Sequence, residues 1–136
     1  MRASIILQNG FFMRKNNIGI VGLGYVGLPL AVNLSKYFNV FGFDISKERL
    51  KNLKQNLDTN YELSKQELKK CRIHYSNMTQ KKDINIDTFI ITVPTPVDNN
   101  NKPNISSLLK ACKFVGKMIK KKTFNNNREH CSSWDY

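Results

Sequence analysis

A chain of 136 residues, 40% of them hydrophobic, is long enough to bury a core as one domain and too apolar for an intrinsically disordered protein. An excess of 22 Lys and Arg over 10 Asp and Glu gives a net charge of +12, a balance found in proteins that bind nucleic acid or membrane surfaces. Aromatic residues are not interleaved with the basic ones as single-strand binding requires, which favours an ordinary basic protein or a fragment that lacks an acidic remainder. No apolar run approaches the roughly 20 residues of a membrane span.

The first predicted elements surround a glycine-rich turn. Residues 1–12 are expected to be an N-terminal extension, since a second methionine, Met13, opens the patterned part of the chain. The apolar run 18–21 predicts a buried parallel strand. The turn leads into a helix predicted over residues 25–38, whose inward face carries an apolar residue at every fourth position: Val26, Leu30, Leu34 and Phe38.

A second strand and a second helix follow. Residues 39–44 predict a strand that ends on Asp44. Residues 46–57 predict a helix with Ser46 as its N-cap. Three leucines are expected on the inward face of that helix: Leu50, Leu53 and Leu57.

The rest of the chain continues the alternation of helices and strands. Residues 64–71 predict a short helix, opened by a capping box that starts at Ser64. Strands are predicted over residues 72–75 and 87–97, and two prolines stop the second of them. Residues 105–119 predict an amphipathic helix with one apolar side: Ile105, Leu108, Leu109, Cys112, Val115 and Ile119.

Strands that alternate with helices predict an α/β fold. We expect a Rossmann-type, doubly wound parallel sheet, cut after about four strands, over residues 13–122. Residues 123–136 show no periodicity and are expected to be irregular. Such a sheet would leave one edge and some apolar surface uncovered, so marginal stability is expected.

Three glycines in the order G-x-G-x-x-G follow the first strand and open the first helix. Gly22 permits the tight turn, Gly24 leaves room for a pyrophosphate to approach the backbone, and Gly27 lets the helix pack close to the strand. The helix N-terminus offers free N–H groups and a positive dipole end to phosphates. Asp44 can accept hydrogen bonds from the adenosine ribose hydroxyls and would repel a 2′-phosphate, so the pattern predicts NAD as cofactor rather than NADP. The alternative is a glycine-rich turn with a capping aspartate.

Spacing alone leaves two further positions open. Arg49, five residues after Asp44, either flanks the adenosine or is a solvated helix charge. Thr95 follows the last predicted strand, in a loop stiffened by Pro94 and Pro96. It either offers a hydroxyl to the ligand or belongs to an ordinary proline-terminated strand.

The other reactive side chains have no spacing typical of a metal or catalytic site: Cys71, Cys112, Cys131, His74 and His130. An odd number of cysteines without such spacing predicts free thiols in a reducing cytoplasm. The carboxylates of Asp58 and Glu62 are expected in a solvated loop.

Five stretches in a fixed order carry a resemblance to a known family: "IGIVGLGYVGLPLAV", "FGFDISKERLKNL", "DTNYELSKQEL", "FIITVPTPVDNNNKPNISSLLKA" and "VGKMIKK". Together they resemble the N-terminal NAD-binding domain of the UDP-sugar 6-dehydrogenases, which include the UDP-glucose and UDP-N-acetylmannosamine enzymes. The resemblance covers residues 14 to about 122. It is nearest to the Vi-antigen and O-antigen dehydrogenases that act on UDP-N-acetylglucosamine or UDP-N-acetylgalactosamine.

The resemblance implies roles at matching positions. The glycine loop holds the NAD pyrophosphate, with backbone N–H groups at Tyr25 and Val26. Asp44 and Arg49 contact the adenosine ribose. The end of the last predicted strand lines the NAD site: Val93, Pro94 and Thr95.

The family oxidises C6 of the sugar from alcohol to carboxylate, with reduction of two NAD⁺, through a cysteine in a glycine-flanked motif of its later part. None of the three cysteines here lies in such a motif, so we assign no catalytic residue and no metal to this chain. A UDP-sugar substrate is expected only in an intact homologue, and a homo-oligomer is left open.

The last residues suggest why the resemblance stops. Plausible codons for "NNNREHCSSWDY", residues 125–136, read one base further on give "IIIESTVPPGT". The family carries "ESTVPPGT" or a near variant at this point. We therefore expect a frameshift near residue 123.

Three functions are weighed. The first is an NAD-binding N-terminal fragment of a UDP-N-acetylhexosamine or UDP-glucose 6-dehydrogenase of capsule or O-antigen polysaccharide synthesis, cytoplasmic and inactive alone. The alternative is a decayed or regulatory fragment that is not an enzyme and pairs with a full-length subunit or binds nothing specifically. A basic nucleic-acid binder ranks last, and it would use Lys117, Lys120, Lys121, Lys122 and Arg128.

Overall fold

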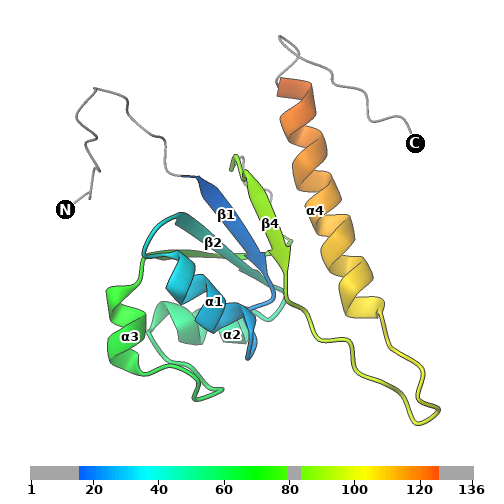
Figure 1. Ribbon diagram of the computed structural model, residues 1–136, viewed down its shortest axis with the longest axis horizontal. Coiled ribbons are helices and arrows are strands. Elements are labelled where there is room, and N and C mark those ends of the chain that lie inside the picture. The colour runs from blue at the N-terminus through cyan, green and yellow to red at the C-terminus, as the bar shows by residue number, and fades with distance from the viewer. Residues whose placement is uncertain (1–15, 80–83, 126–136) are drawn as a thin grey trace.

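The computed structural model describes residues 16–79 and 84–125. In this part of the chain, strands and helices follow one another in the order β1, α1, β2, α2, α3, β3, β4, α4 (Figure 1). The strands are β1 (Asn17–Val21), β2 (Asn39–Asp44), β3 (Ile73–Asn77) and β4 (Thr88–Ile91). The helices are α1 (Gly27–Leu34), α2 (Lys47–Lys54), α3 (Lys65–Lys70) and α4 (Ser106–Asn125).

The four strands form one parallel sheet in the order β3-β2-β1-β4. Gly19 in β1 pairs with Phe41 of β2 on one side and with Phe89 of β4 on the other. The chain builds outward from β1 to β3 and then returns to the opposite side of β1, so the winding reverses between β1 and β4. The predicted α/β, Rossmann-type sheet is confirmed.

Helices cover both faces of the sheet (Figure 1). α1, α2 and α3 pack on one face and α4 on the other. On the first face the buried core consists of Ile18, Ile20, Leu23, Leu28, Ala31, Val40, Leu50, Leu53 and Leu68. On the second face, Val21 and Phe43 of the sheet pack against Ala111 of α4. Val21 is the last residue of β1 and Phe43 the last but one of β2, so α4 packs close to the carboxyl edge of the sheet.

The inward face of α1 differs from the prediction. The helix begins at Gly27, because the residues before it are still part of the glycine-rich turn. Its buried side chains are those of Leu28 and Ala31. Of the four residues predicted inward, Leu30, Leu34 and Phe38 are half-buried and pack against the core, although Phe38 lies beyond the end of the helix. Val26 is 68% exposed.

The predicted N-cap of α2 is confirmed, since Ser46 Oγ accepts a hydrogen bond from the Arg49 backbone N–H at 3.1 Å. Of the three leucines predicted inward, the first two are buried and Leu57 is half exposed. The helix ends at Lys54, and Asn56 then takes a positive φ of 58° that turns the chain away from the helix axis.

The capping box of α3 is confirmed. Ser64 Oγ accepts from the Glu67 N–H at 3.3 Å, and Glu67 Oε2 accepts from the Ser64 N–H at 2.8 Å. β3 then starts at Ile73, within the range predicted for a strand.

β4 is shorter than the strand predicted over residues 87–97. The ladder stops at Ile91, and only the Thr92 N–H continues it, with a 2.8 Å hydrogen bond to β1. Pro94 and Pro96 have no N–H to donate, so the chain leaves the sheet here.

α4 is rotated relative to the predicted face. Its buried and half-buried side chains include Leu108, Ala111, Phe114 and Val115. Four side chains predicted inward are exposed instead: Ile105, Leu109, Cys112 and Ile119. The aromatic contact sets the rotation, because the Phe114 ring lies 5.0 Å from that of Phe43 and the small Ala111 allows a close approach.

α4 also continues to Asn125, three residues into the segment 123–136 that was expected to be irregular. The rest of that tail and the expected extension 1–12 lie outside the described residues. Within residues 16–79 and 84–125, no helix combines the length and hydropathy needed to cross a membrane.

Candidate functional site

The glycine loop lies at the carboxyl end of β1, where the winding of the sheet reverses. The ends of both neighbouring strands hold it. Gly22 donates its N–H to the Phe43 carbonyl of β2 at 2.8 Å, and Thr92 after β4 donates its N–H to the Val21 carbonyl at 2.8 Å. In doubly wound sheets, ligands bind in the crevice at this position.

Gly22 makes the turn out of β1. Its φ is +97°, a conformation that residues with a side chain rarely adopt. A Cβ at Gly22 would also lie 3.0 Å from the Thr92 carbonyl oxygen. Both the backbone conformation and the closeness of the next strand therefore require glycine here.

Gly27 is the point of closest approach between α1 and the turn. A Cβ at this position would overlap the Gly22 carbonyl oxygen and Thr92 Oγ1. Thr92 Oγ1 donates a 2.7 Å hydrogen bond to that same carbonyl and so fixes the first peptide of the loop. Sequence reasoning missed Thr92, because only the register of β4 beside β1 brings it to the glycine loop.

The middle of the loop is open. Apart from its own chain neighbours, no heavy atom lies within 4 Å of the Cβ position at Gly24. Tyr25 and Val26 are 66% and 68% exposed, and their backbone N–H groups have no hydrogen-bond partner among the described residues. α1 has neither a side-chain cap nor an acidic residue in its first turn. This combination of open space, free N–H groups and a helix N-terminus fits an anionic group such as a pyrophosphate.

Asp44 joins the glycine loop to the end of β2. Its Oδ2 accepts a hydrogen bond from the Leu23 N–H, and its Oδ1 accepts one from the Ser46 N–H, each at 2.9 Å. A carboxylate oxygen has two lone pairs, so one acceptor position on each oxygen remains for a ligand hydroxyl.

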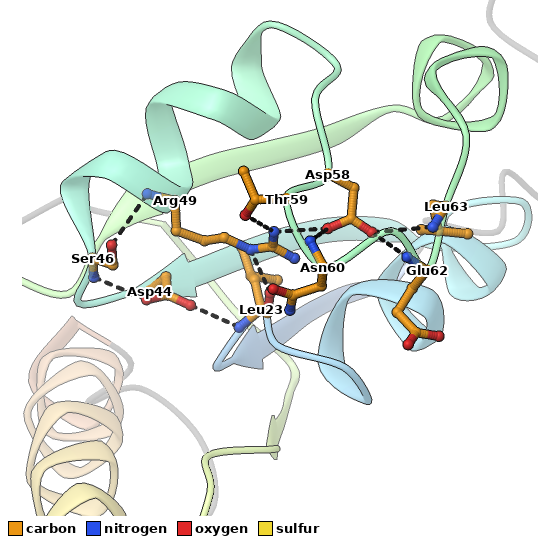
Figure 2. A network of polar contacts seen from close by, with 9 residues as sticks. All are labelled: Leu23, Asp44, Ser46, Arg49, Asp58, Thr59, Asn60, Glu62 and Leu63. Carbon is orange, nitrogen blue, oxygen red and sulfur yellow. Dashed lines mark hydrogen bonds and ion pairs between the residues drawn. The ribbon is translucent and has the colours of Figure 1, made fainter.

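The Arg49 side chain contacts three other residues (Figure 2). Its Nε donates to the Leu23 carbonyl oxygen at 3.0 Å, and its Nη1 donates to Thr59 Oγ1 at 3.0 Å. Nη1 also lies 2.7 Å from Asp58 Oδ1. The side chain is 10% exposed, so the alternative of a solvated helix charge is wrong. The remaining nitrogen, Nη2, is buried and has no hydrogen-bond partner in the described part of the chain.

The expectation that the Asp58 carboxylate lies in a solvated loop is wrong. Its side chain is fully buried, beside Arg49. Its Oδ1 accepts from the Asn60 N–H at 3.0 Å, and its Oδ2 accepts from the N–H groups of Glu62 and Leu63 at 2.9 and 3.0 Å (Figure 2). The Glu62 side chain itself is exposed, as expected. Asp58 opens one of the stretches that carry the family resemblance, but no local pattern predicted its burial, because its partner Arg49 lies on the preceding helix.

The contacts of Asp58 predict a dependence of stability on pH. Burial alone would raise the pKa of this carboxyl, but hydrogen bonds from Asn60, Arg49 and Leu63 and the charge of Arg49 lower it overall. The unfolded chain therefore takes up more protons as the pH falls. This stabilisation is complete above about pH 4, the ordinary pKa of an aspartate, and is lost as the pH falls through the lower folded-state pKa.

Urea unfolding at a series of pH values checks this prediction. The difference in unfolding free energy between the protein and Asp58→Asn should be constant at neutral pH and shrink below about pH 4. A difference that does not change with pH would mean that Asp58 is not ionised in the folded protein.

The loop after β4 begins with a half-buried residue and continues with exposed ones. Val93 packs with the core around Phe43, and its Cγ1 lies 3.1 Å from the Cβ position at Gly22. Pro94 and Thr95 are exposed. No hydrogen bond among the described residues joins Thr95 to the glycine loop.

The remaining candidate side chains do not gather at this edge. Cys71 is half buried, which raises its pKa, and Cys112 is exposed. His74 is exposed and its ring stacks on Phe41 at 5.0 Å. Within the described ranges, no group of three or more His, Cys, Asp or Glu side chains could hold a metal ion. Two further residues lie outside the described part: His130 and Cys131.

Comparison with known proteins identifies the family of this domain. The family model described as "UDP-glucose/GDP-mannose dehydrogenase family, NAD binding domain" matches residues 16–126. Protein CapL of Staphylococcus aureus is 48% identical over 106 residues, which are 77% of this chain and 24% of that protein. The UDP-N-acetyl-D-glucosamine 6-dehydrogenase of Pseudomonas aeruginosa is 40% identical over 111 residues, 80% of this chain and 26% of that protein.

Solved structures share the fold. A UDP-glucose dehydrogenase from Pyrobaculum islandicum superposes with a TM-score of 0.72 at 21% identity, over 86% of this chain and 28% of that one. A GDP-mannose dehydrogenase from Pseudomonas aeruginosa gives a TM-score of 0.66 at 25% identity, over 77% of this chain and 26% of that one. The chain thus spans about a quarter of the length of the relatives it matches.

Proposed function

Because the chain belongs to the UDP-glucose/GDP-mannose dehydrogenase family, as its NAD binding domain, we propose that it provides the cofactor half of a UDP-N-acetylhexosamine 6-dehydrogenase. NAD is the cofactor of this domain. The choice of sugar rests on two relatives, from Pseudomonas aeruginosa and Salmonella typhi, that are named UDP-N-acetyl-D-glucosamine 6-dehydrogenases. The relative CapL supports a place in capsule synthesis.

The open middle of the glycine loop carries the proposal. Space above Gly24 lets a pyrophosphate reach the backbone, and the N–H groups of Tyr25 and Val26 are free to donate to it. Gly22 and Gly27 keep the loop in this shape, since a side chain on either would collide with the backbone beside it.

Two charged residues are proposed to bind the adenosine end of NAD. Asp44 accepts hydrogen bonds from the ribose hydroxyls with its two remaining acceptor positions, and its charge repels a 2′-phosphate. Arg49 is assigned to the same ribose, because its guanidinium, with a side chain 10% exposed, is held beside Asp44 through their shared contact with Leu23. Val93, two residues after the end of β4, lines the site, and the exposed Pro94 and Thr95 that follow it are assigned to the same side of the cofactor.

Bound NAD supplies the hydride acceptor for oxidation of the sugar C6 alcohol to a carboxylate. The residues of this chain bind and orient the cofactor, and none of them is assigned to the chemistry at C6. We infer that the 136-residue chain by itself binds NAD without oxidising a UDP-sugar. NADH formation from UDP-N-acetylglucosamine by the pure chain would refute this.

Calorimetry of NAD binding, beside an Asp44→Ala variant, tests the proposed site. Hydrogen bonds to a charged group contribute about 1.5–3 kcal/mol, so the variant should bind NAD roughly 10- to 100-fold more weakly. Loss of the negative charge should also narrow the preference for NAD over NADP.

Asp98→Ala is the matched control. Asp98 also accepts two backbone N–H groups in a turn, from Asn100 and Lys102, each at 2.8 Å. Its removal changes the net charge equally and should leave NAD affinity unchanged. Equal losses in both variants, or no binding by the parent chain, would contradict the assignment of Asp44.

A further inference from the structure

One set of contacts reaches out of the glycine loop to a segment that the proposed function does not use (Figure 2). From this geometry we propose that Asp58 is a positioning residue of the NAD site, which holds the glycine loop in its binding shape through Arg49. The inference rests on the proposed function, because the loop it positions is the pyrophosphate cradle. The argument follows the chain of contacts from Asp58 to Leu23.

The first step is that Asp58 itself cannot move. Its carboxylate accepts three backbone N–H groups of its own loop, from Asn60, Glu62 and Leu63. The side chain is fully buried, so water cannot replace those contacts. A buried negative charge held in this way is a fixed point for a positively charged partner.

The second step is that Asp58 fixes Arg49. The 2.7 Å contact between Asp58 Oδ1 and Arg49 Nη1 pairs the two charges, and Thr59 Oγ1 accepts from the same nitrogen at 3.0 Å. Since the guanidinium is planar and rigid, fixing Nη1 also sets the direction of Nε and Nη2. Without Asp58 the arginine would be a nine-tenths buried cation with no carboxylate partner in the described contacts.

The third step is that Arg49 fixes the glycine loop. Its Nε donates to the Leu23 carbonyl oxygen at 3.0 Å, between the first two glycines of the motif. The Leu23 N–H is bonded to Asp44, and the Leu23 side chain is fully buried. Leu23 is therefore held at its N–H, its carbonyl and its side chain, and the carbonyl contact depends on Asp58.

The same geometry leaves one guanidinium nitrogen without a partner. With Nε on Leu23 and Nη1 on Asp58, the buried Nη2 has no partner among the described residues. Asp58 therefore decides how the guanidinium is oriented and, through Nε, where the loop carbonyl lies. Asp58 also holds its own loop, residues 58–63, through the three backbone N–H groups that it accepts. Its effect on the glycine loop is a second role, which runs through Arg49.

An Asp58→Asn variant tests the proposal with two readouts. The amide has one acceptor oxygen and no charge, so it cannot accept the three N–H groups and pair with Arg49 at once. If the binding shape of the glycine loop falls to about a tenth of the molecules, apparent NAD affinity weakens about tenfold. Hydrogen exchange at the Leu23 amide should then approach the rate of an unprotected amide, while the Thr92 amide, bonded to Val21 on the other side of β1, keeps its rate.

Asp87→Asn is the matched control. The Asp87 carboxylate accepts the Asn17 N–H at 2.8 Å, at the opposite end of the sheet. This variant should leave both the NAD affinity and the Leu23 exchange rate unchanged. A folded Asp58→Asn variant with unchanged affinity and unchanged Leu23 exchange would overturn the proposal.

If Asp58→Asn does not fold, amide hydrogen exchange in the unmodified chain tests the positioning role of Asp58. The amides of Glu62 and Leu63 donate to Asp58, so they and the Leu23 amide should open with the same free energy, as one cooperative unit. Leu23 protection that outlasts the exchange of Glu62 and Leu63 would overturn the positioning role. If the unmodified chain does not bind NAD, the proposed function fails, while the exchange data still show whether Asp58 holds the glycine loop.

Discussion

Replacing Gly27 with alanine should destroy the cofactor site and destabilise the fold. The added Cβ would overlap the Gly22 carbonyl oxygen and Thr92 Oγ1, and the first of these is backbone that cannot rotate away. Overpacking of this kind costs about 1–3 kcal/mol, and a backbone collision belongs at or above the upper end of that range. We expect a lower urea midpoint and loss of measurable NAD binding by calorimetry.

Gly24→Ala separates the two effects. The same methyl group at Gly24 meets no heavy atom within 4 Å, and Gly24 has no positive φ, so the fold should tolerate it. The methyl group would occupy the space proposed for the pyrophosphate, so NAD affinity should fall while the urea midpoint stays. If Gly24→Ala bound NAD normally, the pyrophosphate would have to lie elsewhere.

Replacing Phe43 with alanine should cause the largest loss of stability among core substitutions on the α4 face. Phe43 is 1% exposed and packs against Phe89 and Phe114, at ring distances of 6.4 and 5.0 Å. Truncation of a buried phenylalanine costs about 3–5 kcal/mol, against a total of about 5–15 kcal/mol for a typical domain. Urea unfolding should show this loss, and α4 should lose its hydrogen-exchange protection first, because Phe43 is its main aromatic contact with the sheet.

Phe41→Ala is the control on the same strand. Phe41 is only half buried, and it stacks on the exposed ring of His74. Its truncation removes less buried area and leaves no closed cavity, so about 1 kcal/mol is expected. Equal losses for the two phenylalanines would show that α4 does not depend on the Phe43 contact.

The glycine loop could be predicted from the sequence because its requirements are local. Gly22 needs a positive φ, and Gly27 meets the carbonyl of a residue only five positions earlier. The Ser46 cap depends on the backbone N–H three residues later. Asp44 at the end of β2 follows from the strand pattern, since in a parallel sheet that end lies beside the end of β1.

The members of the site that spacing did not identify depend on contacts between distant positions. Thr92 lies 70 residues after the Gly22 carbonyl that it holds, and only the pairing of β4 with β1 joins them. Arg49 reaches the Leu23 carbonyl 26 residues earlier, and a charged residue on a helix carries no pattern that distinguishes this from a solvated position. The burial of Asp58 follows from that placement of Arg49.

The sequence by itself determined which elements form, where most of the helices begin and which residues shape the glycine loop. Each of these follows from periodicity, capping or backbone conformation within a few residues. Only the tertiary structure decided which side of α4 is buried and how Arg49 and Asp58 pair. In α4 two apolar stripes compete, and the one with Ala111 and Phe114 is buried because a small residue and an aromatic ring fit against Phe43. Such a choice depends on the shape of the partner surface, which exists only once the sheet has formed.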